Sequence, residues 1–599
     1  MPDETSPLIW SDSGQPRSRL YGDVYFSAED GLAETRAVFL DGCGLPGAWA
    51  GRRRFVVGEL GFGTGLNVAA LLALWAGARP AGGTLSIFSV EAHPISREEA
   101  ARALAHWPEL AGVTAPLLAR WPGAARGVHR VDLPEFGATL DMAVMDVEAA
   151  IAGWTGAADA WFLDGFSPAL NPAMWRAEVL ALVARRSAPG ARAATFTVAG
   201  QVRRDLAAAG FTVDKRPGHG RKRERLEARL PGAAPAGRVV SRVAIVGAGI
   251  AGAAAARAVR ALGGEPVLIE AEAPGAGASG NPAALVTPRL DAGLGPPAQL
   301  FAQAFRRAVA LYGDIPDAVI ARGVRQLAAQ PRDADRFAKI AASGLFEPGT
   351  LELDAGALDQ RAALVVEPAA ILAAWAPVAL CGAVHALSRD AEGWRLLDAR
   401  GGEIARAEAV IVAGAMGSAG LCGGLPLQPA RGQASIAAPF ADPPPATAWG
   451  GYAIPTGDGL LFGATYDPDD VGTEVRDRDH ARNLAALSAV LPDLAARLAD
   501  VALGGRASIR ATTPDRMPIA GPSPDGAPGL FVLTGLGSRG FSLAPLLAEH
   551  VVALALGAPS PLPAPLAALV DPDRFRQRAA RRGSHAPGAA LYQGSRDAV

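Results

Sequence analysis

The stretch VAIVGAGIAG, Val243 to Gly252, is the feature that most limits what this chain can fold into. An apolar strand runs straight into Gly247, Gly249 and Gly252, and a second apolar strand, PVLIE, ends at Glu270. Such glycines permit a tight turn, the approach of a pyrophosphate and close helix packing, while an acid about 20 residues on accepts hydrogen bonds from ribose hydroxyls. The pattern predicts a β-α-β unit that binds FAD or NAD, because an acidic residue disfavours a 2′-phosphate.

A second glycine-rich turn lies in VVGELGFGTGLN, Val56 to Asn67. An apolar strand precedes it and the apolar run VAALLALWA follows, so a helix N-terminus would face a bound cofactor. Glu91 ends the next strand, where a carboxylate can accept hydrogen bonds from a ribose diol. A purely structural turn and a solvated Glu91 are the alternatives. The candidate cofactor-binding residues of this half are Glu59, Gly61, Gly63, Gly65, Asn67, Glu91 and Asp146.

The length of 599 residues exceeds what one hydrophobic core normally organises, since single domains mostly span about 50 to 250 residues. The segment PGAAPAG, Pro231 to Gly237, separates the two glycine motifs and favours neither helix nor strand. We place the domain boundary there, with domains at residues 1–235 and 236–599. Before it, alternating strands and amphipathic segments predict a wound α/β sheet. The predicted strands are Phe55–Leu60, Leu85–Val90, Met142–Asp146, Ala160–Leu163 and Ala193–Val198.

Composition narrows the setting of these domains. The formal net charge of −2 excludes a uniformly basic nucleic-acid binder, although a local basic patch can still attract phosphates. The three cysteines form no C-x-x-C pair and the eight histidines show no i, i+4 pairing, so we expect no disulfide framework and no metal. We find no signal peptide and no apolar run of about 18 residues. We therefore expect a cytoplasmic monomer without a membrane segment.

The strongest local signal in the N-terminal half is DAWFLDGFSPALNPAMW, Asp159 to Trp175. It places Asp164 at the carboxyl end of an apolar strand, where open α/β sheets bind ligands. The Pro- and aromatic-rich loop that follows is suited to form a rigid wall on which a base stacks. The alternative is that Asp164 caps a turn, the usual role of Asp before Gly.

Several motifs of this half, in the same order, resemble the methyltransferase domain of the tRNA 5-methylaminomethyl-2-thiouridine biosynthesis family. They are DVYFS, GLAETRAVFL, ELGFGTGLN, WFLDGFSPALNPAMW and GRKRE. The resemblance implies a Rossmann-like domain that uses S-adenosylmethionine as methyl donor, with Asp164 as catalytic residue beside the reacting amine. A primary aminomethyl group is protonated near neutral pH, so a nearby carboxylate can orient the ammonium and accept its proton.

The segment from Lys215 to Arg229 carries seven basic residues against Glu224 and Glu227. A charge run of this kind is usually a solvated face. Beside a predicted tRNA site it favours phosphate contacts, which give affinity without sequence reading. The candidate tRNA-binding residues are Lys215, Arg221, Lys222 and Arg223.

The C-terminal half resembles the D-amino-acid-oxidase superfamily, in GAGASGNPAALV, PARGQ, SIRATTPDRMPIAG and GLGSRGFSLAP. The resemblance implies FAD rather than NAD and an antiparallel substrate sheet inserted into the FAD-binding domain. It also implies that Arg510 is a catalytic-site residue that clamps a substrate carboxylate, a task that the planar guanidinium performs bidentately. A surface ion pair is the alternative for Arg510. The flavin contacts implied are Gly247, Gly249, Gly252, Glu270, Ser279, Gly280, Gly535, Gly537, Ser538, Arg539 and Gly540.

Together the two resemblances imply a bifunctional enzyme that acts on the wobble uridine in the anticodon loop of tRNA. FAD-dependent oxidation would remove the carboxymethyl group of 5-carboxymethylaminomethyl-2-thiouridine as glyoxylate, and methylation would convert the resulting 5-aminomethyl-2-thiouridine into 5-methylaminomethyl-2-thiouridine. Two alternatives remain open from the sequence. One is a metabolic glycine- or sarcosine-type amine oxidase fused to an unrelated methyltransferase, and the other is a tRNA-binding scaffold with degenerate sites.

Overall fold

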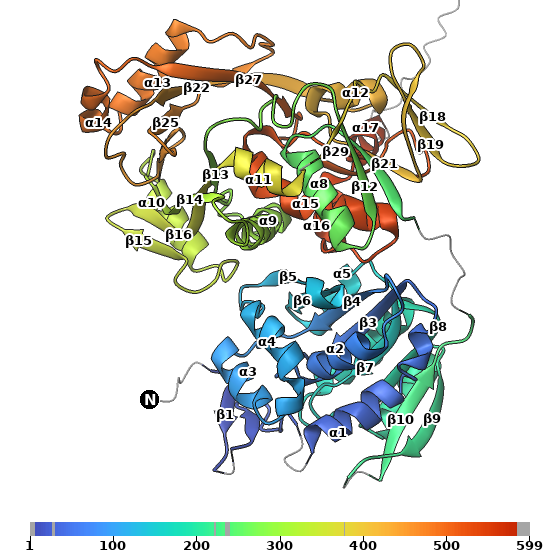
Figure 1. Cartoon of the computed structure of the whole chain (residues 1–599). Helices are drawn as coiled ribbons and strands as arrows, with labels where there is room; N and C mark the ends of the chain where they lie inside the picture. Colours follow the sequence, from blue (N-terminus) through green and yellow to red (C-terminus); the bar gives the residue numbers. More distant parts are fainter. Residues whose placement is uncertain are drawn as a thin grey trace, which may run out of the picture.

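The computed structural model describes residues 6–12, 14–26, 30–220, 223–233, 240–376 and 378–583. Two bodies lie one against the other, the N-terminal one in blue to cyan and the C-terminal one in green to red (Figure 1). The N-terminal body ends with β10 (Glu224–Arg229) and the C-terminal body begins with β11 (Arg242–Val246). The predicted domain boundary falls between these strands, among residues outside the described ranges, and stays a prediction.

The N-terminal body is an α/β domain built on an eight-stranded sheet of order β5-β6-β4-β3-β7-β8-β10-β9. Its five central strands are parallel, whereas β5, β9 and β10 run antiparallel to their neighbours. The parallel strands are β3 (Arg54–Leu60), β4 (Thr84–Val90), β6 (Ala138–Val144), β7 (Ala158–Leu163) and β8 (Ser187–Thr195). The antiparallel ones are β5 (Gly127–Leu133), β9 (Thr212–Pro217) and β10 (Glu224–Arg229).

Helices cover both faces of this sheet, and each face has its own apolar core. One core packs beneath α2 (Leu66–Ala78) and α4 (Ala111–Ala119), and the other beneath α5 (Val147–Gly153), α6 (Ala177–Arg185) and α7 (Gly200–Ala208). The remaining elements are β1 (Leu8–Trp10), β2 (Pro16–Ser18), α1 (Gly31–Thr35) and α3 (Arg97–Leu104). The doubly covered parallel sheet explains why its strands read as continuous apolar runs.

The predicted strands correspond to β3, β4, β6, β7 and β8, and two of them begin and end at earlier residues than predicted. The strand predicted at Met142–Asp146 is β6, which begins at Ala138 and ends at Val144, because the Asp146 side chain already caps α5. The strand predicted at Ala193–Val198 is β8, which begins at Ser187 and ends at Thr195. The sequence did not predict the three antiparallel strands, because polar and charged residues interrupt the apolar ones in β5 and β10 and make up most of β9.

The C-terminal body begins with a six-stranded sheet of order β17-β12-β11-β21-β29-β28, parallel except for β28. These strands are β11 (Arg242–Val246), β12 (Glu265–Glu270), β17 (Leu380–Cys381), β21 (Ala409–Val412), β28 (Ile519–Pro522) and β29 (Leu530–Thr534). A small sheet, β18 (Ala386–Arg389), β19 (Trp394–Leu397) and β20 (Glu403–Ala407), follows β17 along the chain.

A second large sheet carries the expected insertion and is antiparallel except where β14 pairs with β23. Its path runs β13-β16-β14-β23-β24-β25-β22-β26, with β15 on β16 and β27 on β22. The strands are β13 (Ala284–Val286), β14 (Val319–Gln326), β15 (Leu351–Asp354), β16 (Ala357–Val366), β22 (Gln428–Ala437), β23 (Thr447–Ala448), β24 (Tyr452–Pro455), β25 (Leu460–Gly463), β26 (Asp467–Pro468) and β27 (Gly504–Thr512).

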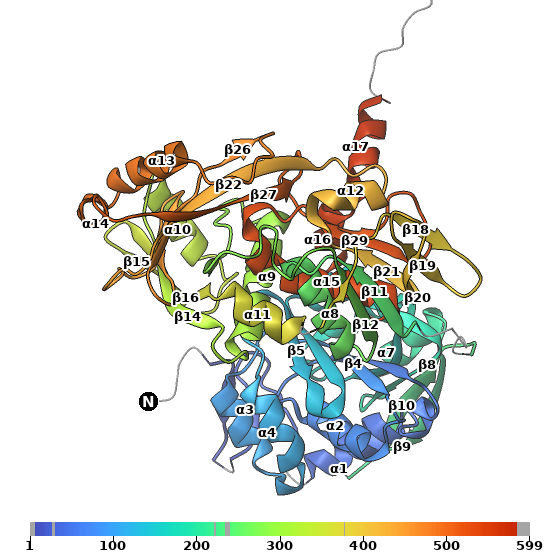
Figure 2. The same ribbon diagram turned by 45° about the horizontal axis from the view of Figure 1, so that its top comes forward.

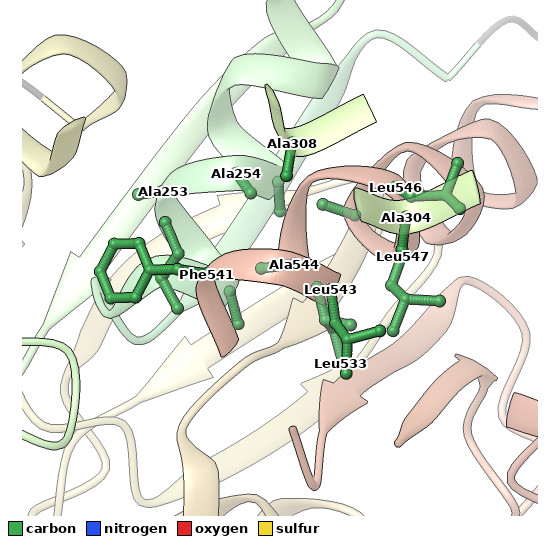
Figure 3. Packing of buried hydrophobic residues seen from close by; sticks show 14 of the residues in the cluster. Ala253, Ala254, Ala304, Ala308, Leu533, Phe541, Leu543, Ala544, Leu546 and Leu547 are labelled. Carbon is green, nitrogen blue, oxygen red and sulfur yellow. The ribbon is translucent and has the colours of Figure 1, made fainter. Parts of the chain in front are cut away.

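Helix α15 (Gly540–Leu556) is the centre of the C-terminal core and packs against α8 (Ile250–Ala261) and α9 (Pro296–Gly313). Alanines of α8 and α9 face Phe541, Leu543 and Leu547 (Figure 3), so the helices approach closely. The remaining helices are α10 (Asp333–Ala341), α11 (Pro368–Trp375), α12 (Ser418–Leu421), α13 (Asp477–Ser488), α14 (Pro492–Arg497), α16 (Ala564–Val570) and α17 (Arg574–Gly583).

One helical stretch, Gly537–Leu556, is long and apolar enough to cross a membrane. Of its most apolar window, 83% is buried inside the protein. The core around α8 and α9 therefore accounts for its apolar composition.

The two bodies meet where the edge strand β5 lies against α9 (Figure 2). Asp132 of β5 forms ion pairs with Arg257 of α8 and with Arg307 of α9, the latter at 2.7 Å. Both arginines also pair with Glu549 of α15, which is 3% exposed. We call Asp132, Arg257, Arg307 and Glu549 the interdomain ion cluster. It joins the edge of one sheet to the central helices of the other domain.

The charges of the cluster compensate one another, although Arg307 and Glu549 are buried and the other two members are partly buried. Burial raises the pKa of Glu549, but the charges of Arg307 and Arg257 outweigh this effect and lower it to about 2. Beside the cluster, Arg130 of β5 pairs with Asp141 at 2.6 Å and donates to the carbonyl of Pro559. The carboxylate of Glu347 accepts the backbone N–H groups of Ala124 and Ala125 across the same interface.

Replacing Glu549 by Gln tests the cluster. The substitution leaves the buried Arg307 and the partly buried Arg257 with Asp132 as their one remaining carboxylate in the cluster. Removing one partner of a buried pair typically costs about 3 to 5 kcal/mol. We expect a loss of this order in the free energy of unfolding, measured by urea denaturation. Glu403→Gln, at a solvent-exposed ion pair with Arg395, should leave stability unchanged. Equal stability of E549Q and wild type would contradict a structural role for the cluster.

Candidate active sites

A cavity of about 780 Å³ opens at the carboxyl edge of the N-terminal parallel sheet. Its lining includes residues from the ends of four neighbouring strands, as expected for a ligand site in an open α/β sheet. Of the predicted residues, Gly61, Gly63, Asn67, Glu91, Asp146 and Asp164 line it. Glu59 and Gly65 lie behind this surface, with Gly65 at the N-cap of α2.

The glycine turn is held against the loop that follows β7. Gly61 has φ 97°, and a Cβ atom there would lie 2.3 Å from the carbonyl oxygen of Asp164. The N–H of Gly63 donates to Glu91 Oε2 at 3.0 Å, and Glu91 Oε1 accepts the N–H of His93. The turn, the carboxylate expected for the ribose and the candidate catalytic loop therefore meet at one cavity. This arrangement fits S-adenosylmethionine. The glycine backbone and Glu91 would hold it in the cavity.

A chain of hydrogen bonds orients Asp164. Asn67 Nδ2 donates to Asp164 Oδ2 at 2.6 Å, and Asn67 Oδ1 accepts the hydroxyl of Thr35 at 2.9 Å. Both Asn67 and Thr35 are buried. Thr35 belongs to the GLAETRAVFL motif, so the structure explains why this motif accompanies the glycine turn. Asn67 acts on Asp164 as well as lining the cavity.

Glu59 is fully buried beneath the turn, at the end of β3. Its Oε2 accepts the hydroxyl of Ser89 at 2.5 Å, while no residue in the described ranges hydrogen-bonds to Oε1. Burial raises the pKa of this carboxyl to about 8, and the charge of Asp164 adds to the rise. The protein environment thus favours the neutral form of Glu59, and positive charge arriving in the cavity would favour the charged form.

Aromatic side chains form one wall of the cavity. Phe166, from the loop after Asp164, lies 5.2 Å between ring centroids from both Tyr21 and Tyr25. Asp23, between the two tyrosines in sequence, accepts the N–H of Ser167 at 2.9 Å and so attaches the N-terminal segment to this loop. The sequence predicted the aromatic loop but not its partners, because no local pattern relates positions 21 and 166.

The basic segment lies on the β9–β10 hairpin beside the cavity. Lys215 Nζ pairs with Glu224 at 2.7 Å, and Arg225 pairs with Glu227 at the same distance. Arg223 is exposed, whereas the predicted Arg221 and Lys222 lie outside the described residues. Such surface pairs contribute little to stability, so phosphates can replace the carboxylates at low cost.

The C-terminal fingerprint forms the expected turn at the end of β11. Gly247 has φ 103°, and a Cβ atom on Gly252 would lie 1.8 Å from the carbonyl oxygen of Gly247. Glu270 Oε2 accepts the N–H of Ala248 at 2.6 Å, and Ser279 Oγ accepts the N–H of Ile250 at 3.0 Å. The predicted acid and the second predicted contact thus both border the glycine turn, a backbone cradle that fits FAD.

Arg506 of β27 fixes the loop that contains the predicted Gly280. Its Nη2 donates to the carbonyl oxygens of Ala276 and Gly277, and its Nη1 donates to Asn281 Oδ1. The substrate sheet is thereby attached to the flavin-binding segment. Sequence reasoning did not identify this residue.

Arg510 projects from β27 across its neighbour β22. It pairs in register with Ala430, and its guanidinium lies over Gly432, where a Cβ atom would be 2.1 Å from Nη1. Nη1 donates to the carbonyl oxygen of Thr465 at 3.3 Å. Burial lowers the pKa of Arg510, and nearby Tyr452 and Tyr466 oppose this effect. Within the described ranges this partly buried guanidinium forms no ion pair with a carboxylate, so it suits an anionic ligand.

The motif PARGQ, Pro429 to Gln433, places different functions on the two faces of β22. Gly432 faces Arg510, whereas Arg431 is fully buried and pairs with Asp479 at 2.6 Å. Arg431 also donates to the carbonyl oxygens of Gly472 and Glu474. The motif thus gives Arg510 space on one side and fixes the loop before α13 (Asp477–Ser488) on the other.

The predicted loop Gly535–Gly540 connects β29 to α15. Gly535 has φ 70°, and a Cβ atom there would contact Thr513 at 2.9 Å. Gly540 begins α15 beside Ile250 of α8, Gly537 has φ 57° and Ser538 is exposed. Arg539 Nη1 donates to the carbonyl oxygens of Thr287 and Pro288, each at 3.3 Å. Arg539 therefore fixes a neighbouring segment in this structure.

Fold and sites define a protein that joins two nucleotide-binding domains, one of methyltransferase type and one of flavin oxidase type. A family model described as S-adenosyl-L-methionine-dependent methyltransferase matches residues 108–231. A model described as FAD dependent oxidoreductase matches residues 242–554.

Curated relatives cover almost the whole chain. A protein of Caulobacter sp. (strain K31), named tRNA 5-methylaminomethyl-2-thiouridine biosynthesis bifunctional protein MnmC, is 60% identical over 595 residues, 96% of this chain and 98% of that relative. One of the same name from Maricaulis maris is 45% identical over 98% of each chain. A solved glycine oxidase from Geobacillus kaustophilus is 25% identical, with a TM-score of 0.45, and covers 54% of this chain and 98% of that one. The chain belongs to the family of tRNA 5-methylaminomethyl-2-thiouridine biosynthesis bifunctional proteins.

The space over Gly432 can be tested with Gly432→Ala. A new Cβ would meet the guanidinium at the end of the flexible Arg510 side chain. The fold should therefore tolerate the change, while the guanidinium is displaced. We expect a rise of about tenfold or more in the KM of the oxidation, since a charged hydrogen bond contributes about 1.5 to 3 kcal/mol. Ala430→Gly, at the neighbouring position that faces Arg510 in register, is the matched control. An unchanged KM in G432A would show that Arg510 does not need this space.

Proposed function

We propose that this chain carries out two consecutive modifications of the wobble uridine in the anticodon loop of tRNA. The C-terminal domain removes the carboxymethyl group from 5-carboxymethylaminomethyl-2-thiouridine, and the N-terminal domain methylates the resulting 5-aminomethyl-2-thiouridine. The observation that carries the proposal is that each domain holds one group of suitable charge. The guanidinium of Arg510 over Gly432 suits a carboxylate, and the carboxylate of Asp164 in the N-terminal cavity suits an amine. The relatives from Caulobacter and Maricaulis support it, since both are named tRNA 5-methylaminomethyl-2-thiouridine biosynthesis bifunctional proteins.

In the oxidation, FAD supplies a hydride acceptor for the carbon between the amine and the carboxylate of the substrate. The residues that would hold FAD are those of the turn Gly247–Gly252, Glu270, Ser279 and the loop Gly535–Gly540. Arg510 would bind the substrate carboxylate bidentately, and Gly432 leaves room for this geometry. The oxidation converts the C–N bond of the substrate into a C=N bond. Water then hydrolyses this bond, which releases glyoxylate and leaves the aminomethyl group on the uridine.

In the methylation, Asp164 would accept a hydrogen bond from the substrate ammonium and then its proton, so that the neutral amine attacks the methyl group. Asn67 and Thr35 would keep the carboxylate in position for this transfer. Tyr21, Tyr25 and Phe166 would hold the uracil ring by stacking. Because S-adenosylmethionine is already activated, proximity and alignment supply most of the remaining acceleration.

A tRNA substrate points to the cytoplasm as the place of the reaction. We propose that the protein acts there as a monomer and needs no metal. Within the described ranges no three His, Cys, Asp or Glu side chains gather as metal ligands. Lys215 and Arg223 on the β9–β10 hairpin would contact phosphates of the tRNA near the methylation site, together with Arg221 and Lys222.

Mass spectrometry of wobble nucleosides tests both activities in one experiment. Substrate tRNA is incubated with the purified protein, with and without S-adenosylmethionine. We expect the aminomethyl nucleoside to accumulate without the methyl donor and the methylaminomethyl nucleoside to form with it. No change in the tRNA under either condition would overturn the proposal, and turnover of free glycine or sarcosine without action on tRNA would favour a metabolic amine oxidase.

Asp164→Asn should separate the two activities. The amide cannot accept the ammonium proton, and general acid–base catalysis typically contributes about 10²- to 10⁴-fold. We expect methyl transfer to fall by at least about 100-fold while the aminomethyl nucleoside still forms at the wild-type rate. Asp205→Asn on the exposed surface of α7 is the matched control. Full methylation by D164N would remove Asp164 from the mechanism.

A further inference from the structure

A second cavity, of about 290 Å³, lies in the C-terminal domain apart from the two nucleotide turns. Its lining includes four arginines, Arg289, Arg332, Arg336 and Arg539, together with Asp333 and Trp449. Asp333 supplies the one carboxylate of the lining. We call this site the arginine cavity.

The carboxylate in the arginine cavity is already used within the protein. Asp333 is 5% exposed, and its Oδ2 accepts the backbone N–H groups of Ala329 and Gln330. Its Oδ1 pairs with Arg336 at 3.3 Å. Arg539 donates to carbonyl oxygens and to the hydroxyl of Thr287, and Arg289 lies over the ring of Phe301. The lining therefore keeps an excess of positive charge.

The positive charges of the cavity oppose one another. Burial, together with the charge of Arg289, lowers the pKa of Arg539 to about 10. Arg289 and Arg332 are both exposed, so an incoming anion can reach them. An anion bound among these guanidinium groups would relieve the repulsion and gain charge-assisted hydrogen bonds.

Trp449 adds an aromatic surface to this anion site. It lies, half-buried, in the turn between β23 and β24, and its inner side packs against the apolar cluster of Phe462 and Leu487. A guanidinium cluster beside an indole matches the backbone and base of single-stranded RNA, because phosphates bind Arg and bases stack on aromatic rings. A volume near the lower end of small-ligand sites suits one nucleotide rather than a whole loop.

The position of the arginine cavity relates it to the oxidation site. Tyr452, three residues after Trp449, lies within electrostatic reach of Arg510. On the other side, Arg539 belongs to the glycine loop Gly535–Gly540 predicted to contact the flavin. A nucleotide in this cavity would therefore lie near a nucleoside bound at Arg510.

We propose that the arginine cavity binds an anticodon-loop nucleotide adjacent to the wobble uridine, with its phosphate at Arg289 and Arg332 and its base on Trp449. This inference rests on the proposed oxidation of the wobble nucleoside in tRNA. It assigns to the C-terminal domain an RNA contact of its own, separate from the basic hairpin β9–β10 of the methyltransferase domain.

The test compares the wild type, the double variant Arg289→Ala/Arg332→Ala and Arg400→Ala in the full-length holoenzyme. Arg400 is an exposed arginine on the distant β19–β20 turn and serves as matched control. Oxidation is followed with two substrates, tRNA carrying 5-carboxymethylaminomethyl-2-thiouridine and the free nucleoside. We expect the double variant to show at least about a tenfold higher KM for tRNA. The slope of the logarithm of tRNA affinity against the logarithm of salt concentration should become less steep by about 1 to 2. The kcat with tRNA and the oxidation of the free nucleoside should stay unchanged.

Trp449 is tested separately because stacking is insensitive to salt. Trp449→Ala should raise the KM for tRNA without a change in salt slope, and Trp449→Phe should restore most of the affinity. Equal KM and equal salt slope in wild type and double variant would overturn the proposal. A second result would also overturn it: the double variant no longer binds inorganic phosphate, but its KM for tRNA equals that of the wild type. The cavity would then bind only a free anion. Failure of the wild type to oxidise tRNA would instead overturn the proposed function.

Discussion

The close approach of backbone to backbone at the carboxyl edges of the two parallel sheets is the constraint on which both sites depend. A Cβ atom on Gly252 would lie 1.8 Å from the oxygen of Gly247, and one on Gly61 would lie 2.3 Å from the oxygen of Asp164. Any larger residue would push the turn away from its neighbour. Because the turns stay closed, the first amides of α2 and Glu91 face one cofactor site, and the first amides of α8 and Glu270 face the other.

The relation between the domains depends on a different kind of interaction. Asp132, on an edge strand, reaches Arg257 and Arg307 on helices of the other domain, and Glu549 completes the charge balance from α15. Charges removed from water need partners, so separating the domains would leave Arg257, Arg307 and Glu549 without the charge of Asp132. The edge of the β5 strand is covered at the same time, which protects it from pairing with other chains.

The sequence predicted the fold class, five of the parallel strands and both glycine turns, because each depends on short-range patterns of apolar residues and glycine. It also predicted Asp164 and Arg510 through their motifs. It did not predict the hydrogen bond from Asn67 to Asp164, the contact of Phe166 with Tyr21 and Tyr25, or the space that Gly432 leaves for Arg510. Each of these joins segments whose distance along the chain carries no periodic signal.

The sequence by itself determined that this chain has two nucleotide-binding turns and belongs to a family of tRNA-modifying bifunctional proteins. Local sterics of glycine and the alternation of apolar strands and helices act over a few residues, so they can be read from the residue order alone. Only the tertiary structure decided that β22 would carry Gly432 beneath Arg510, and that Arg289, Arg332 and Trp449 would share a cavity. Strand register and helix packing fix these contacts, and they depend on the balance of the whole core rather than on any single segment.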